Sequence, residues 1–137
     1  MTAIDAETVA AYRRTAYRMA PGWSIWIDRY SPELAEWHAR QGVESSGFVS
    51  AVNPCSQVLP ASENERRHLN LLGCIERRGL IFLTGAGVDP VGSWPAEPGC
   101  LIAGLGREDA AQLGRRFDQN AVVWSGTDAI PRLILLR

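Results

Sequence analysis

The strongest constraint on the fold is the way short apolar runs alternate with stretches that carry helix signals. Six runs of four or five residues are apolar and bounded by glycine, proline or asparagine, which is typical of β-strands. They are Trp23–Ile27, Phe48–Val52, Leu80–Leu83, Cys100–Ala103, Ala121–Trp124 and Leu133–Leu136. We therefore predict an α/β fold, with α+β as the alternative, in a single layered domain spanning residues 1–137. A mixed sheet of about five to six strands would be packed by three to four helices.

Caps and apolar periodicity locate the helices. Ser31, followed by proline and glutamate, has the composition of a helix start, and Gly42 marks the corresponding end. A second helix is predicted to begin at a capping box on Ser62 and to run to about Arg78. Two further helices are predicted from Asp5 to about Arg14 and from Arg107 to Phe117. The segment Thr84–Gly99 is rich in glycine and proline and is predicted to be one long loop.

The composition excludes several kinds of chemistry. All 14 basic residues are arginine, so Schiff-base formation, pyridoxal attachment and a phosphate-binding lysine are ruled out. Two histidines cannot make a three-histidine zinc site, and no GxSxG, HExxH, GxGxxG or phosphate-loop motif occurs in a suitable context. We predict no metal and no cofactor. A net charge of −1 gives no general attraction to nucleic acid, so that partner is not favoured.

The cysteines and the start of the chain indicate a location. Cys55, Cys74 and Cys100 are odd in number and widely spaced, which fits a reducing compartment better than a disulfide framework. Asp5 and Glu7 stand near the start without a long apolar stretch, unlike a signal peptide. No run approaches the roughly 18 apolar residues of a membrane helix. These features predict a cytoplasmic protein with no membrane partner.

Polar residues occur where strands and helices meet. A turn from Asn53 to Ser56 follows the strand Phe48–Val52, at a favoured place for a ligand site, although an Asx turn explains the same residues. In the helix that follows, a spacing of 100° per residue places Asn64 and His68 on the apolar stripe with Leu71. Inward polar groups need hydrogen-bond partners, so these two predict either a structural network or a site.

Two later motifs have similar pairs of interpretations. In the long loop Trp94 precedes Pro95, and Glu97 lies between Pro95 and Pro98; Trp94 and Glu97 could form a recognition edge, or Trp94 could simply cover the core. Gln119 and Asn120 could present amides at the mouth of the sheet or cap the preceding helix. The paired arginines could form a phosphate-binding face, or they could be partners of glutamates one helical turn away, which we favour. The expected pairs are Glu63 with Arg67 and Glu36 with Arg40.

The motifs and the order in which they follow one another along the chain resemble those of a known bacterial family. The matching stretches are Ala51–Ser56, Glu63–Asn64, Trp94–Glu97 and Phe117–Trp124, with Ala11–Arg13 and Tyr17–Arg18 near the start. Together they resemble the domain of unknown function 3293. The resemblance implies that Asn53, Ser56, Asn64, Glu97, Gln119 and Asn120 belong to the signature of that family. Asp118 departs from it where glycine is usual, and Val52 where an aromatic residue is common.

The residues favour recognition over catalysis. We predict a small polar-ligand-binding or regulatory module, with a pocket formed by Asn53, Ser56, Asn64, Trp94, Glu97, Gln119 and Asn120. This prediction requires Asn53 and Gln119 to lie at the same end of the sheet.

Two alternatives remain open. One is a small hydrolase or nucleic-acid-processing enzyme in which Glu97 or His68 is the acid–base residue. The other is a protein-interaction module without a pocket, with an exposed apolar patch around Trp23 and Trp26. Self-association into a homodimer is left open, and size-exclusion chromatography would test it.

Overall fold

One seven-stranded sheet forms the centre of the molecule. The structure is a computed structural model that describes residues 4–92 and 94–137. The strands follow the order β2-β1-β4-β5-β3-β6-β7, and every hydrogen-bonded pair is antiparallel. Their bounds are β1 (Ala16–Met19), β2 (Ser24–Ile25), β3 (Ser46–Ser50), β4 (Phe82–Val88), β5 (Glu97–Ala103), β6 (Ala121–Ser125) and β7 (Arg132–Leu135). The layered fold is confirmed in its α+β form, but the sheet is antiparallel rather than mixed and has seven strands.

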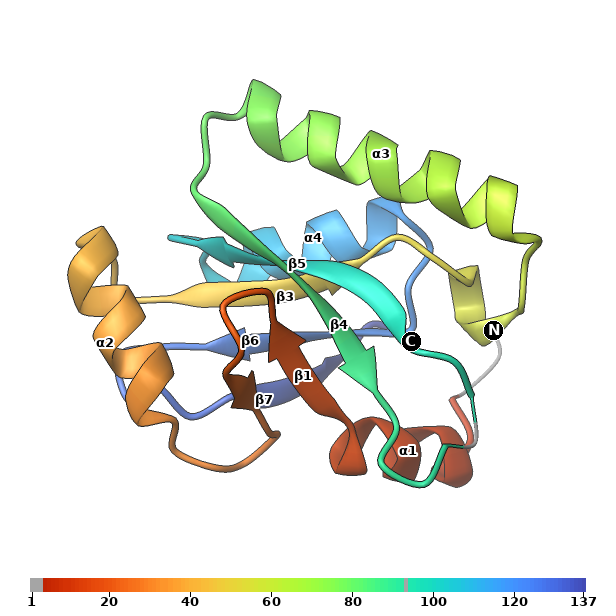
Figure 1. Cartoon of the computed structure of the whole chain (residues 1–137), viewed down its shortest axis with the longest axis horizontal. Helices are drawn as coiled ribbons and strands as arrows, with labels where there is room; N and C mark the ends of the chain where they lie inside the picture. The colour runs from red at the N-terminus through yellow and green to blue at the C-terminus, as the bar shows by residue number, and fades with distance from the viewer. Residues whose placement is uncertain (1–3, 93) are drawn as a thin grey trace.

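Four helices surround this sheet, as the caps predicted (Figure 1). They are α1 (Ala6–Arg14), α2 (Pro32–Gln41), α3 (Ala61–Arg77) and α4 (Arg107–Arg116), with a short 3-10 helix η1 (Pro54–Ser56) before α3. The Ser31 hydroxyl accepts the Leu34 N–H at 3.1 Å, and Gly42 closes α2 in the left-handed conformation. The prediction of a capping box on Ser62 is wrong, because α3 begins at Ala61, directly after Pro60, and no side chain caps its start.

Two hydrophobic clusters lie on opposite faces of the sheet. Successive strand residues point to opposite sides, so Val49 joins the cluster under α3 and α4, whereas Phe48 joins the cluster beside α2. The first cluster also holds Leu71 of α3 and Leu113 of α4. The second contains Trp37 of α2. The curled sheet is therefore covered on both faces over much of its area.

The predicted long loop is shorter than the sequence indicated. Strand β4 continues through Thr84 to Val88, and β5 already starts at Glu97, so only residues 89–96 connect them. Gly85 and Gly99 allow close packing inside the sheet: a Cβ atom on Gly85 would lie 2.6 Å from the carbonyl oxygen of Arg18 in β1, and one on Gly99 would lie 2.7 Å from the Phe48 ring. The prediction of one long loop over Thr84–Gly99 is therefore wrong, because both ends of this segment belong to strands.

The tryptophans of the predicted apolar patch are only partly exposed. Trp23 packs against Trp37, with ring centroids 6.5 Å apart, and belongs to the margin of the second cluster. Trp26 is 39 % exposed and lies under the guanidinium group of Arg29. These contacts use part of the apolar surface that a docking site would need.

Candidate functional site

The antiparallel register brings the polar motifs to one end of the sheet. Ser50, the last residue of β3, faces Gly99, the third residue of β5. Phe48 faces Val123, so β6 also begins beside the end of β3. The end of one strand and the starts of its two neighbours therefore coincide. Asn53 and Gln119 consequently lie at the same end of the sheet, as the ligand-site prediction requires.

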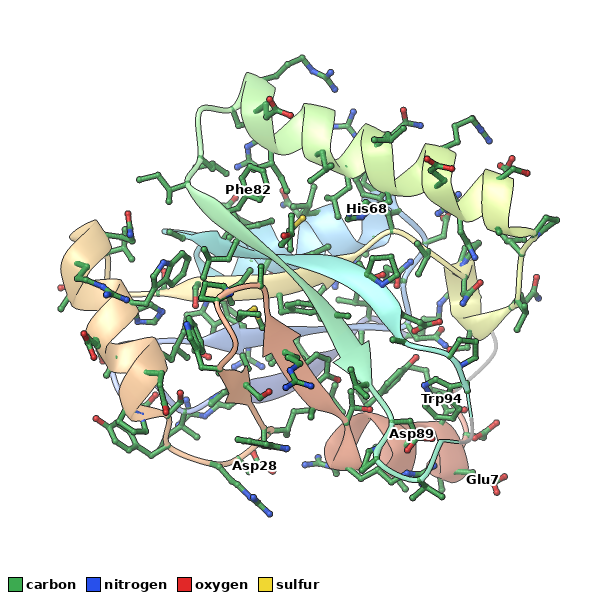
Figure 2. The ribbon with its side chains drawn as sticks, viewed as in Figure 1. Glu7, Asp28, His68, Phe82, Asp89 and Trp94 are labelled. Atoms are coloured by element: carbon green, nitrogen blue, oxygen red, sulfur yellow. The ribbon has the colours of Figure 1, made fainter. Side chains whose placement is uncertain are left out.

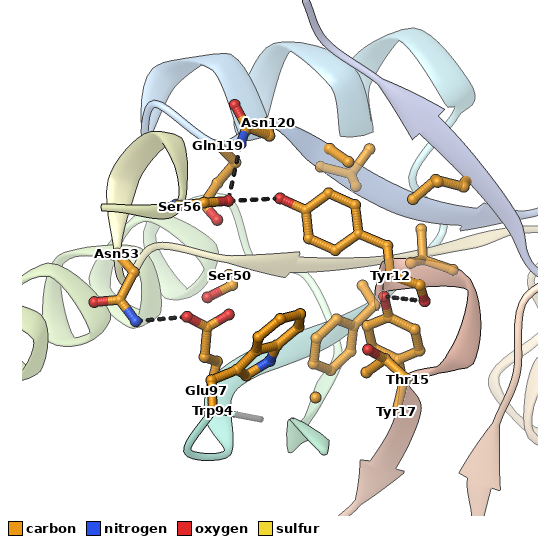
Figure 3. A pocket seen from close by; sticks show the side chains of 16 residues that line it. Tyr12, Thr15, Tyr17, Ser50, Asn53, Ser56, Trp94, Glu97, Gln119 and Asn120 are labelled. Atoms are coloured by element: carbon orange, nitrogen blue, oxygen red, sulfur yellow. Dashed lines mark hydrogen bonds between the residues drawn. The ribbon is translucent and has the colours of Figure 1, made fainter. Parts of the chain in front are cut away.

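A cavity lies at this end, between the sheet and α1 (Figure 3). Its volume is about 70 Å³, which is several times the roughly 15 Å³ that one water molecule needs. It is lined by Tyr12, Thr15, Tyr17, Phe48, Ser50, Asn53, Ser56, Gly87, Trp94, Glu97, Gln119, Asn120, Ala121, Val122, Val123 and Leu133. Six of the seven predicted site residues are among them, and Asn64 is the exception.

Glu97 supplies the carboxylate of the cavity. The Asn53 side-chain amide donates to Glu97 Oε2 at 2.5 Å, as Figure 3 shows. No side chain of the described residues donates a hydrogen bond to Oε1. Burial raises the pKa of Glu97 above its usual value, and the hydrogen bond from Asn53 opposes that rise. The cavity thus holds one half-buried acidic group with an oxygen free to accept.

Asn64 holds this arrangement from behind the cavity wall. Its Oδ1 accepts the Asn53 backbone N–H at 2.9 Å, and its Nδ2 donates to Asn53 Oδ1 at 2.8 Å. Asn53 Oδ1 also accepts the Leu59 N–H at 3.1 Å. The network places Asn53 in the left-handed region, with φ of 47°, and aims its amide at Glu97. Asn64 therefore positions Asn53 and does not itself line the cavity.

Ser56 connects two other walls of the cavity. Its hydroxyl lies 2.9 Å from the hydroxyl of Tyr12 and accepts the Asn120 side-chain amide at 2.9 Å. Tyr17 lies deeper and donates to the Tyr12 carbonyl oxygen at 3.3 Å. Burial is the main reason that the pKa of Tyr17 is raised, and the nearby charge of Glu97 adds to it. Helix α1 is therefore fixed to the turn by side-chain contacts.

Gln119 and Arg67 fix the backbone around the turn. Gln119 donates to the carbonyl oxygens of Val52 and Phe117, both at 3.1 Å, so it partly caps α4 as well as lining the cavity. Arg67 donates to Ala51 at 2.6 Å and to Phe117 at 2.5 Å. The predicted Glu63–Arg67 pair is therefore wrong.

The glutamate partners along the helices differ from the prediction in one case. Glu63 pairs with Arg66 on α3, which leaves Arg67 free to reach backbone oxygens. The Glu36–Arg40 pair on α2 is confirmed at 3.7 Å. The left-handed residue after α4 is Asp118, at φ 57°, and not Asn120. Glycine adopts a positive φ most easily, so the glycine that is usual in the resembled family would suit position 118.

Trp94 forms the outer wall next to α1, where Arg14 lies 5.6 Å from its ring centroid. Arg14 in turn bonds Asp89 at 3.1 Å. The aromatic residues Tyr12, Tyr17 and Phe48 were not singled out as site residues from the sequence. The two tyrosines were visible only as part of the family resemblance at the start of the chain.

His68 lies apart from the cavity. Figure 2 shows it on the sheet-facing side of α3, far from Trp94, and it does not line the cavity. Its Nδ1 is buried with no hydrogen-bond partner among the described residues, and burial lowers the pKa of its ring. Of the two predicted acid–base residues, Glu97 lines the cavity and His68 does not.

No metal site or membrane span is found in the described part of the chain. No three histidine, cysteine or acidic side chains gather there as metal ligands would. None of the helices over residues 4–92 and 94–137 is long and apolar enough to cross a membrane. Cys55, Cys74 and Cys100 are free thiols.

Comparisons with known proteins support the resemblance. Neither the curated proteins nor the solved structures gave a significant match. A family described as "Protein of unknown function (DUF3293)" matches residues 49–122, more than half of the chain. The matched segment runs from β3 to the start of β6 and contains all seven predicted ligand-site residues. The chain belongs to the DUF3293 family of proteins of unknown function.

Proposed function

We propose that the protein binds a small polar ligand in the cavity between the sheet and α1. The observation that carries this proposal is the convergence of Asn53, Ser56, Trp94, Glu97, Gln119 and Asn120 on one cavity. These residues come from three segments far apart in the sequence. Apolar walls with a few fixed polar groups are typical of small-molecule sites.

The cavity also has the rigidity that recognition requires. Asn53, Ser56 and Gln119 are each held by hydrogen bonds to other parts of the chain. A ligand that enters therefore meets groups already in place, and little ordering entropy is lost on binding. A volume of about 70 Å³ favours a small molecule, or one small group of a larger molecule, over a whole dinucleotide.

A thermal-shift screen against nucleotides and metabolites would test this proposal. A ligand at 100 times its dissociation constant stabilises the fold by about 2.7 kcal/mol, which is a shift of several degrees. The shift should be lost or reduced in Trp94→Ala, because this side chain forms a wall of the cavity. Trp26→Ala is the matched control, since Trp26 is half-exposed and does not line the cavity. An undiminished shift in Trp94→Ala, or a screen with no hit, would count against the proposal.

A second candidate is an enzyme in which Glu97 transfers a proton. The specific observation is a half-buried carboxyl group of raised pKa that lines the cavity and whose Oε1 accepts no hydrogen bond from a described side chain. Glu97→Gln would then abolish turnover of the bound molecule even at concentrations that saturate the site. Equal turnover by both forms would exclude this role for Glu97.

We also propose a cytoplasmic location, which the three free thiols support. A pocketless interaction module is the weaker candidate, because Trp23 is engaged with Trp37. A monomeric mass in size-exclusion chromatography would exclude a stable homodimer at the concentration used.

A further inference from the structure

The charge distribution at the cavity is one-sided. The chain has 14 basic residues, yet none of them lines the cavity. Glu97 is the one charged side chain among the lining residues, which all belong to the described part of the chain. Arg14 lies over the ring of Trp94, outside the cavity lining, and is paired with Asp89, whose side chain is fully buried. From this distribution we infer that the ligand carries a positive charge, as an organic ammonium ion.

The polar groups of the cavity also favour a cation over an anion. Six lining side chains already donate hydrogen bonds to acceptors of the protein: Thr15, Tyr17, Ser50, Asn53, Gln119 and Asn120. An anion needs free donors, and these groups are largely committed. Glu97 Oε1, in contrast, is an acceptor to which none of the described side chains donates. A bound N–H group would satisfy it in a charge-assisted hydrogen bond.

Aromatic rings complete the environment that an ammonium ion prefers. Tyr12, Tyr17, Phe48 and Trp94 all line the cavity, and the Tyr17 and Phe48 rings pack with centroids 5.2 Å apart. The negative face of an aromatic ring attracts a cation, and this attraction grows when the cation is shielded from water. A carboxylate among aromatic rings therefore recognises the charge and the apolar substituents of an ammonium ion together. This inference rests on the proposed ligand site and adds the chemical class of its occupant.

Four compounds of nearly the same shape test the sign of the charge. The cations are 3,3-dimethylbutan-1-amine and choline; the neutral and anionic analogues are 3,3-dimethylbutan-1-ol and 3,3-dimethylbutanoate. Isothermal titration calorimetry at pH 7.5 should show binding of at least one cation. The alcohol should bind at least roughly tenfold more weakly, because it forms no ion pair with the Glu97 carboxylate, and the carboxylate should bind more weakly still, because Glu97 repels it. The inference is overturned if the alcohol or the carboxylate binds as tightly as the better-binding cation, or if neither cation binds.

Variants separate this inference from the proposed site. Glu97→Gln keeps the shape and the acceptor for Asn53 but removes the charge, so it should weaken cation binding roughly ten- to hundredfold. Glu44→Gln, on an exposed residue outside the cavity, should bind as the wild type does. Full cation affinity in a folded Glu97→Gln, checked by circular dichroism, refutes the role of charge. If the neutral or anionic analogue binds best and Trp94→Ala abolishes that binding, the site stands and only the charge inference fails. If Trp94→Ala changes no binding at all, the site fails too.

Discussion

Removal of the Asn64 side chain should loosen the turn that carries Asn53. Asn64 makes three hydrogen bonds: one accepted from the Asn53 N–H at 2.9 Å, one donated to Asn53 Oδ1 at 2.8 Å and one donated to the Leu59 carbonyl at 3.4 Å. The Asn64→Ala variant loses all three. It also leaves the half-buried Asn53 N–H without its acceptor, while Asn53 Oδ1 keeps the Leu59 N–H.

The size of the effect follows from these contacts. Two good hydrogen bonds and one long one contribute about 1 kcal/mol each or less, and an orphaned N–H adds at least about 1 kcal/mol. The helix propensity of alanine over asparagine offsets about 0.5 kcal/mol of this loss. Water can reach the half-exposed turn and offsets a further part. We therefore expect the free energy of unfolding to fall by about 2 kcal/mol, which lowers Tm by roughly 6–10 °C in a domain of this size.

Asn70→Ala provides the matched control on the same helix. Asn70 lies in α3 as well, but its side chain is exposed. Urea unfolding followed by tryptophan fluorescence should give Asn70→Ala a midpoint equal to or slightly above that of the wild type. Asn64→Ala should have a lower midpoint with an unchanged slope, because the folded state stays compact. Equal midpoints for the two variants would show that the network around Asn53 contributes nothing to stability.

Three further predictions concern pH and packing. Burial raises the pKa of Glu97 above 4.5, so this side chain stabilises the fold when protonated at low pH and loses that contribution as the pH rises. Glu97→Gln should therefore have a higher Tm than the wild type at pH 8, and the difference in Tm should disappear toward pH 4. The buried His38 has Nε2 2.7 Å from Ser46 Oγ, and burial lowers its pKa. The Tm of the wild type should therefore fall as the pH drops below 6.5, and the Tm of His38→Gln should fall less over the same range. A Cβ atom on Gly99 would lie 2.7 Å from the Phe48 ring, so Gly99→Ala should lose about 1–3 kcal/mol in urea unfolding.

The helix predictions succeeded where the signal is local. Ser31 and Gly42 bound α2 as predicted, because capping depends only on side chains and backbone within one turn. The predicted N-cap at Ser62 is wrong because the N-cap of α3 is Pro60, two residues earlier. The partners of Arg67 also could not be predicted from neighbouring residues, because its acceptors, the carbonyl oxygens of Ala51 and Phe117, lie 16 and 50 residues away in the chain.

The strands show the limits of reading turn residues as loops. Thr84–Val88 contains two glycines and was assigned to a loop, yet it pairs with both β1 and β5. Glycine is present at position 85 because β1 passes so close that a side chain would collide with its backbone. β1 itself was missed, because its four residues are too few for a clear alternation of buried and exposed side chains.

The polar part of the candidate site could be predicted, but its aromatic walls could not. Asn53, Glu97 and Gln119 are conspicuous because polar groups at strand ends have no obvious local partners in the sequence. Tyr17 and Phe48 look like ordinary core residues, and both do belong to the second cluster. Their role as walls depends on how the sheet curls toward α1, and a single sequence does not encode that curvature in any local motif.

Backbone strain in the turn supports its interpretation as a binding site. Asn53, Cys55 and Ser56 all have positive φ, which is unfavourable for residues with a Cβ atom. Such strain persists only when surrounding contacts hold it, and it collects where geometry serves a function. The contacts are present: Asn64 holds Asn53, and the Asp118 carbonyl oxygen accepts the Cys55 N–H at 2.7 Å. A simpler turn could connect β3 to α3 without this strain. What the strained turn adds is the placement of an amide against Glu97 and of a hydroxyl between Tyr12 and Asn120, on the wall of one cavity.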